Sequence, residues 1–253
     1  MGRIVGLITD PWFYAVALPA VLLMGISKSG FGAGFGALAT PLMALAVPVP
    51  QAAAIMLPLL AVIDAMGLAA LWRERDRRLL KLMLPAGLLG VGVGALLFGV
   101  MSAKTVAGVV GGVTLAFLAI RLFFPPKTDA PPPPAWLGWG LSVVSGFTSF
   151  VAHAGGPPIG FYVLPQKLKP IVFTATMAVF FAAVNAAKWL PYAWLGLIDG
   201  RNMLTSLTLL PVAPLGVWIG VRLARVLPQQ LFYRLFLIGM ALTGTKLLWD
   251  GLR

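Results

Sequence analysis

Long apolar segments follow one another along almost the whole chain, and they restrict its fold more than any other feature does. We expect apolar segments at residues 12–28, 36–47, 51–72, 82–101, 104–124, 136–152, 157–165, 170–190, 202–224 and 229–249. Runs of about 18 or more apolar residues are long enough to cross a bilayer as helices. With 60% hydrophobic and 10% charged residues, the composition excludes a soluble domain. The sequence therefore predicts an all-α, polytopic membrane protein.

A glycine-rich stretch, Gly25–Pro41, separates the first two of these segments. Each glycine inside a helix costs about 1 kcal/mol relative to alanine, yet apolar helix-forming sequence flanks the stretch on both sides. We therefore expect a helix, an irregular glycine turn with exposed N–H groups, and a second helix that begins near Gly36. Exposed amides, a helix N-terminus and Lys28 together favour the binding of an anion.

The two halves of the chain repeat each other at an offset of 121 residues. This offset aligns Gly25 with Gly146, Ser27 with Thr148, Gly34 with Gly155 and Asp64 with Asn185. After a five-residue insertion, residues 85–94 match residues 211–220 at five of ten positions. We expect a first membrane repeat over 1–124, a stiff proline-rich linker over 125–135 and a second membrane repeat over 136–253. Each repeat is expected to hold one glycine-broken helix pair and three spanning helices.

Basic residues are distributed unequally between equivalent loops of the two halves. Five of them lie in the loop at 73–81, where the second half has Arg201, whereas 48–50 has none and the second half has Lys167 and Lys169. Inverted repeats place equivalent loops on opposite sides of the membrane, which produces this alternation under the positive-inside rule. We therefore expect inverted repeats, with the arginine-rich loop, the lysine loop and the linker in the cytoplasm and both termini outside. The alternative is eight plain spans with both termini inside, which explains the arginine-rich loop equally well but not the alternation.

Duplicated transporters usually bind substrate near the membrane midplane, between broken helices at the interface of the repeats. The sequence therefore predicts a secondary transporter of small anions, with the anion bound between the two glycine-rich helix breaks. Backbone amides approach an anion most closely where side chains are absent, which explains the glycines. The expected binding residues lie in those breaks: Ser27, Lys28, Ser29, Gly30, Gly32, Gly34, Thr148, Ser149, His153, Gly155 and Gly156.

Ionisable side chains inside apolar segments indicate how transport is coupled to an ion gradient. Asp64, its repeat partner Asn185 and the single histidine His153 are the expected coupling residues, because a carboxylate or an imidazole can carry a proton. Each charged residue also has a structural alternative. Lys28 can snorkel to a membrane interface, Asp64 can simply pair with Lys28, and His153 can lie at a helix end that faces water.

The residues present argue against several other kinds of site. There are no cysteines and no clustered histidines and acids with metal-ligand spacing, so neither a metal nor any other cofactor is expected. The net charge of +12 lies largely in loops, as the positive-inside rule requires, so no nucleic acid partner is expected. The expected partners are a small anion and membrane lipid. Whether the chain forms a homo-oligomer is left open by the sequence.

An enzyme is not expected, because no nucleophile–base pair stands out. The alternative to a transporter is a membrane-embedded enzyme or assembly factor that acts on lipid-linked substrates. Three further glycine pairs have the small-xxx-small spacing of helix-packing contacts: Gly90/Gly94, Gly108/Gly112 and Gly216/Gly220.

The segments GISKSGFGAGFGALATP at 25–41 and GFTSFVAHAGGPPIGFYVLP at 146–165, with the two-half organisation around them, resemble the sulfite exporter TauE/SafE family of membrane permeases. The second segment departs from the first, since it carries His153 and Pro157–Pro158 in place of further glycines. The resemblance implies an exporter in the cytoplasmic (inner) membrane. It also implies a sulfur-containing anion such as sulfite or an organosulfonate as substrate. Nothing in the residues alone specifies sulfur.

Overall fold

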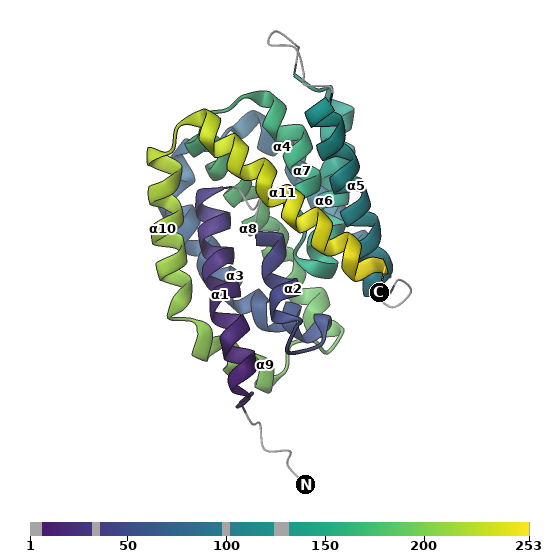
Figure 1. The fold of residues 1–253 in the computed structure, drawn as a ribbon, viewed down its shortest axis with the longest axis vertical. Helices are drawn as coiled ribbons and strands as arrows, with labels where there is room; N and C mark the ends of the chain where they lie inside the picture. Colours follow the sequence, from purple (N-terminus) through teal and green to yellow (C-terminus); the bar gives the residue numbers. More distant parts are fainter. Residues whose placement is uncertain (1–6, 32–35, 98–101, 124–131, 253) are drawn as a thin grey trace.

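A computed structural model describes residues 7–31, 36–97, 102–123 and 132–252 (Figure 1). Within these ranges all of the regular secondary structure is helical, and turns and short irregular segments connect the helices. The helices are α1 (Pro11–Gly30), η1 (Gly36–Leu38), α2 (Ala39–Met43), α3 (Val49–Leu71), η2 (Trp72–Glu74), α4 (Arg77–Leu97), α5 (Ala103–Phe123), α6 (Ala135–Ala152), α7 (Gly156–Val163), η3 (Leu164–Gln166), α8 (Pro170–Trp194), α9 (Gly200–Leu209), α10 (Val212–Val226) and α11 (Gln229–Leu252).

Six helices in the described part of the chain are long and apolar enough to cross a membrane, or seven if the bent pair α9–α10 forms one span. They include α1, α3, α4, α6 and α8. This confirms the prediction of an all-α, multi-pass membrane protein.

The segment expected at 202–224 is not one helix. It consists of α9 and α10, which meet at an angle of 53°. Pro211 lies at the junction, and a proline has no N–H with which to continue the hydrogen-bond ladder of α9. Hydropathy is continuous across the break, so the apolar pattern alone predicted a single segment.

Helix α4 begins five residues earlier than expected, at Arg77. The Asp76 carboxylate accepts hydrogen bonds from the backbone N–H groups of Arg78 (2.8 Å) and Leu79 (3.1 Å). An acidic residue at this position satisfies amides that otherwise have no partner in the first turn. With this cap α4 begins at Arg77, so basic residues that were expected in the loop lie in the first turns of the helix.

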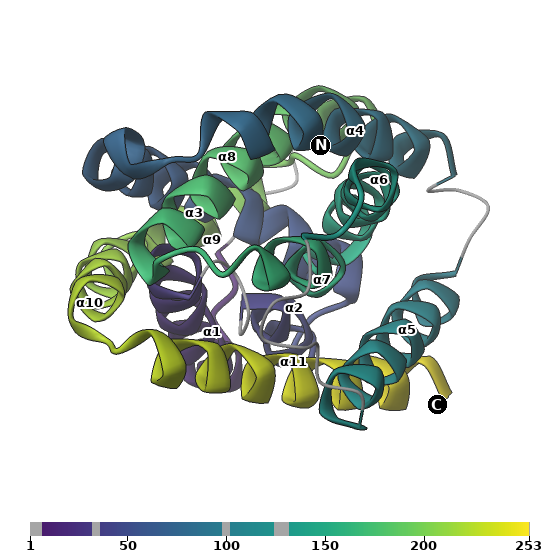
Figure 2. The ribbon, with the colours of Figure 1, turned by 90° about the horizontal axis from the view of Figure 1, so that it is seen from above.

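The most extensive helix–helix contacts join one half of the chain to the other. They are α5 with α11, α4 with α6, α1 with α10, and α3 with α8 (Figure 2). In the repeat alignment α1 corresponds to α6 and α4 to α10, so the contacts α4–α6 and α10–α1 are equivalent. The two halves are thus interlocked rather than packed as separate bodies.

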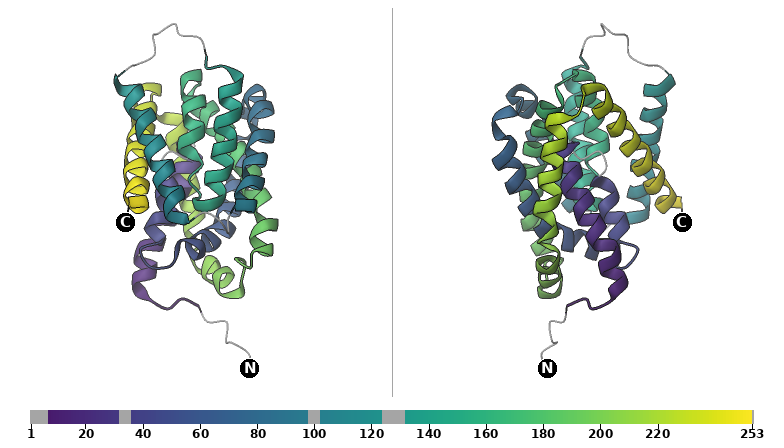
Figure 3. Two further views of the ribbon diagram at one scale, coloured as in Figure 1. Left: turned by 90° about the vertical axis from the view of Figure 1, so that its right-hand side faces the viewer. Right: turned by 60° about the vertical axis from the view of Figure 1, so that its left-hand side comes forward.

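Helices α1 and α6 begin at opposite ends of the molecule (Figures 1 and 3). The inverted relation of the repeats and the sides of the membrane on which the loops lie stay predictions.

Glycines allow these helices to approach closely. A Cβ atom added at Gly216 would lie 2.8 Å from the Leu22 carbonyl oxygen, and one at Gly220 would lie 2.7 Å from that of Ile26. The other predicted pairs also lie at helix contacts: Gly90 faces Val143, Gly94 faces Phe150, and Gly108 faces Gly251. The helix-packing prediction is confirmed for these residues, whereas a Cβ at Gly112 would make only an ordinary contact, 3.9 Å from Leu248.

Replacing Gly90 with alanine is expected to destabilise the protein, because the added methyl group would overlap the backbone carbonyl of Val143 on α6. Overpacking of this kind typically costs about 1–3 kcal/mol. The matched control is Gly92→Ala on the same helix, where an added Cβ meets nothing within 4 Å. Thermal unfolding in detergent should show a lower midpoint for Gly90→Ala and an unchanged or higher one for Gly92→Ala. Equal midpoints would mean that the α4–α6 contact is looser than described.

Candidate functional site

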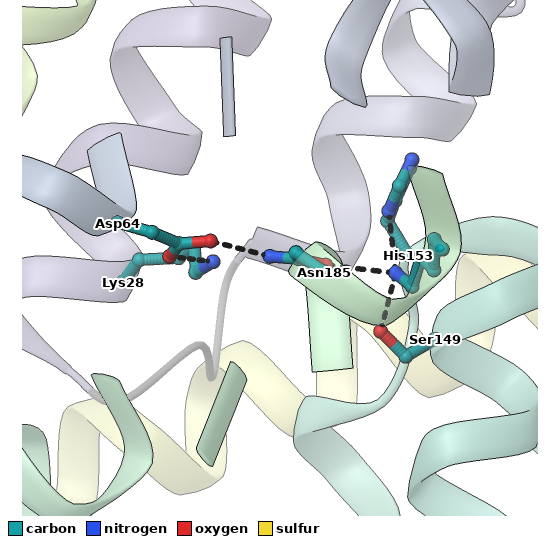
Figure 4. A network of polar contacts seen from close by, with 6 residues as sticks. Lys28, Asp64, Ser149, His153 and Asn185 are labelled. Atoms are coloured by element: carbon teal, nitrogen blue, oxygen red, sulfur yellow. Dashed lines mark hydrogen bonds and ion pairs between the residues drawn. The ribbon is translucent and has the colours of Figure 1, made fainter. Parts of the chain in front are cut away.

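A cluster of polar side chains is buried where α1, α3, α6 and α8 meet (Figure 4). Each of its members is at most 8% exposed. They are Lys28 on α1, Asp64 on α3, Ser149 and His153 at the end of α6, and Asn185 and Lys188 on α8. These side chains form one continuous network, which we call the buried polar cluster.

Lys28 and Asp64 form a buried ion pair in this cluster. Lys28 lies in the last turn of α1, where the unpaired carbonyl ends of a helix favour a positive charge. The Lys28 side chain is 5% exposed, which disagrees with the snorkelling alternative. The second Asp64 oxygen accepts a hydrogen bond of 2.7 Å from the side-chain amide of Asn185. The two residues that the repeat aligns therefore contact each other directly.

Lys188 belongs to the cluster but was not among the site residues expected from the sequence. Its side chain is fully buried, and its ammonium group lies 2.7 Å from Ser149 Oγ, 2.8 Å from Asn185 Oδ1 and 3.0 Å from His153 Nδ1. Three acceptors match the three donors of an ammonium group. The available signal was a lysine one helical turn after Asn185 inside an apolar span.

His153 ends α6 in a left-handed conformation, with φ of 52°. Its Nε2 atom lies 3.1 Å from the Ala53 carbonyl oxygen on α3. Because a carbonyl oxygen can only accept, Nε2 carries a hydrogen, and Nδ1 is then the acceptor for Lys188. The ring is 8% exposed, which disagrees with a histidine that faces water. His153 thus holds Lys188 and ties the second half of the chain to α3.

In the first helix break, Gly32 and Gly34 lie outside the described residues. The Ser27 hydroxyl accepts a 2.7 Å hydrogen bond from the Gly36 amide and so joins the end of α1 to η1. Gly30 packs against α10, where a Cβ would lie 2.8 Å from the Gly220 carbonyl oxygen. Ser29 is buried beside Gly67 on α3. The contacts of these residues fix the position of the end of α1 relative to η1, α3 and α10.

In the second break, hydroxyl groups again hold the backbone. Thr148 Oγ1 donates to the Ala154 carbonyl (3.2 Å), and Ser145 Oγ donates to the Gly155 carbonyl (2.7 Å). The amides of His153 and Ala154 bond to carbonyls of α6, and the prolines at 157–158 have no N–H. Most amides of this break are therefore not free to surround an anion, contrary to the expectation from the sequence.

A small cavity lies between the two breaks, with a volume of about 10 Å³, close to the minimum for one water molecule. Its lining combines polar side chains with apolar ones: Met24, Lys28, Gly36, Leu60, Ser149, His153, Gly156, Phe181 and Asn185. The structure thus brings five expected site residues to one place, namely Lys28, Ser149, His153, Gly156 and Asn185. Asp64 adjoins them through its two partners. The expected residues Ser27, Ser29, Gly30, Thr148 and Gly155 do not line the cavity.

The ionisable side chains at this site are two lysines, one carboxylate and the His153 imidazole. Among the described residues, no group of three histidine, cysteine or acidic side chains could hold a metal ion. The arrangement provides hydrogen-bond donors and positive charge in an enclosed, largely apolar space. That combination suits the binding of a small anion.

A family model described as "Sulfite exporter TauE/SafE" matches residues 17–247 of the chain. Comparisons with curated proteins and with solved structures give no match. The matched region contains both helix breaks and the whole buried polar cluster.

Proposed function

The chain belongs to the sulfite exporter TauE/SafE family, a family of transporters, and on this basis we propose that it is a secondary transporter that binds a small anion at the buried polar cluster. The substrate class is a sulfur oxyanion or small organosulfonate, exported across the cytoplasmic (inner) membrane. The observation that carries the proposal is the charge of the cluster. Lys28 and Lys188 are both buried, whereas the cluster has one carboxylate, Asp64, which pairs with Lys28 and is joined to Lys188 through Asn185.

An excess of positive charge in a low-dielectric interior favours an anion that neutralises it. Lys28 lines the cavity directly. Lys188 lies behind the cavity wall and acts through Ser149, whose oxygen accepts from Lys188. The hydroxyl hydrogen of Ser149 is then available to donate into the cavity. The anion is bound by Lys28 and Ser149, with one amide hydrogen of Asn185 beside them. Because the cavity as described holds only about one water molecule, this binding requires the two helix breaks to move apart.

His153 is a positioning residue in this proposal. Both ring nitrogens are already used, one by Ala53 and the other by Lys188. The ring therefore fixes Lys188 rather than contacting the anion through nitrogen, which differs from the role expected from the sequence.

Coupling to a proton gradient follows from competition for Lys28. Asp64 and an anion in the cavity both attract the same ammonium group. A proton on Asp64 weakens the ion pair and releases Lys28 toward the anion. Anion and proton thus bind more tightly together than either does alone, and Asn185 links this event to Lys188.

Purified protein in liposomes is expected to carry sulfite or a small organosulfonate in a saturable manner, with faster flux when a pH gradient is imposed in the direction of transport. Protein-free liposomes and an organic cation of similar size serve as controls. In a thermal-shift measurement, a substrate at 100 times its Kd should stabilise the protein by about 2.7 kcal/mol. Product formation from a lipid-linked substrate without any anion flux would instead support the alternative class of membrane enzyme.

A further inference from the structure

We propose that the seam between the end of α3 and the end of α10 binds the phosphate headgroup of an anionic phospholipid. The site lies away from the buried polar cluster and does not depend on the proposed transport function. The seam forms a groove of about 630 Å³. Its lining residues are Leu68, Ala69, Ala70, Trp72, Arg73, Glu74 and Arg225.

The groove joins two helices from different halves of the chain. The Arg225 guanidinium donates a 3.4 Å hydrogen bond to the Ala70 carbonyl oxygen at the end of α3. This bond uses only one of the five donors of an arginine side chain. Arg73 lines the same groove from η2. Two guanidinium groups on one groove can bind a phosphate through paired N–H donors.

A second observation places a lipid here rather than a soluble anion. On α10, the residues Leu215, Trp218, Arg222 and Arg225 follow each other at the spacing of one helix face. Leu215 is 51% exposed and Trp218 is 53% exposed, and the Arg222 guanidinium stacks 3.9 Å above the Trp218 ring. The face is therefore apolar toward the middle of the helix and basic toward its end. Acyl chains fit the first part and a phosphate fits the second.

The aromatic and basic residues of the α3 side repeat this pattern. Trp72 is 49% exposed, and the Arg75 guanidinium lies 3.7 Å from the centre of its ring. The apolar span of α3 ends at Glu74, where tryptophan and arginine are typical of the membrane interface. Glu74 itself opposes an anion, but Arg73 and Arg225 line the groove with it and leave the lining with a net positive charge.

The test is a lipid titration of the full-length protein in detergent, with phosphatidylglycerol, phosphatidylcholine and glycerol phosphate as separate ligands. Phosphatidylglycerol should raise the midpoint of thermal unfolding and remain bound as at least one lipid in native mass spectrometry. The Arg73→Gln/Arg225→Gln double variant should bind it at least tenfold more weakly. Glu74→Gln should bind it more tightly, because the opposing carboxylate is removed.

The matched control is Arg77→Gln, which removes a charge close by in the chain but lines a different groove. It should keep the affinity of the wild type. An equal loss of affinity for phosphatidylglycerol in Arg77→Gln and in a single Arg225→Gln variant would show general attraction to a basic face and would overturn the proposal. Stabilisation by glycerol phosphate at the same concentrations would show a site for soluble phosphates and would also overturn it. Since the substituted arginines at 73 and 225 are exposed, the unfolding midpoints of these variants without added lipid should match that of the wild type. Arg225→Lys provides a milder variant that keeps the charge.

Discussion

Replacing Lys188 with methionine is expected to weaken anion binding by about 10- to 100-fold and to reduce transport below detection. Methionine keeps most of the length and volume of the lysine but removes the charge. A hydrogen bond to a charged group contributes about 1.5–3 kcal/mol, and about 1.4 kcal/mol corresponds to a tenfold change in affinity. Because Lys188 acts through Ser149, its loss also leaves the Ser149 hydroxyl free to turn away from the cavity.

The control is Lys246→Met on α11, where the lysine pairs with Asp250 and is only part-buried. It should leave anion affinity unchanged. A double-mutant cycle with Ser149→Ala gives the sharper test. If Lys188 acts through Ser149, the double variant should bind only slightly more weakly than Lys188→Met alone. Full additivity would mean that the two side chains act independently, and wild-type affinity in Lys188→Met would make the lysine a purely structural residue.

The sequence predicted most of the helices because each apolar segment is long and bounded by prolines, glycines or charges. The first helix break was predicted for the same kind of reason, from five glycines around Lys28. Its start was predicted too early, because α1 continues through Gly25 and Lys28 to Gly30. The repeat added one long-range inference. It aligned Asp64 with Asn185, and the structure joins these two side chains by a direct hydrogen bond.

The role of Lys188 could not be read from the repeat, because the alignment places it opposite Gly67 in the first half. The lysine that the first half contributes to the buried polar cluster lies on α1, whereas the one from the second half lies on α8. Only the packing of α6 against α8 brings Lys188 to Ser149 and His153. The contact between His153 and the Ala53 carbonyl is likewise a product of tertiary packing, since no local pattern pairs residues 100 positions apart.

The second large effect is expected from breaking the buried ion pair between Lys28 and Asp64. Replacing Asp64 with alanine is expected to destabilise the protein by about 3–5 kcal/mol, because Lys28 would be left as an uncompensated buried charge. The Asn185 amide would also lose its acceptor. Unfolding in detergent, followed by temperature or denaturant, measures this loss. Asp250→Ala, which breaks the part-buried pair with Lys246, is the control and should cost less than about 1 kcal/mol.

The double variant Lys28→Met/Asp64→Met separates structure from function. Removing both charges of a buried pair is often neutral or stabilising, because neither charge must then be desolvated. The double variant should therefore regain most of the stability lost in Asp64→Ala. If Lys28 binds the anion and Asp64 takes the coupling proton, this stable protein should still fail to transport. Gradient-driven flux in the double variant at the wild-type rate would show that the pair only holds α1 against α3, and that the anion is bound by the Lys188 side of the cluster alone.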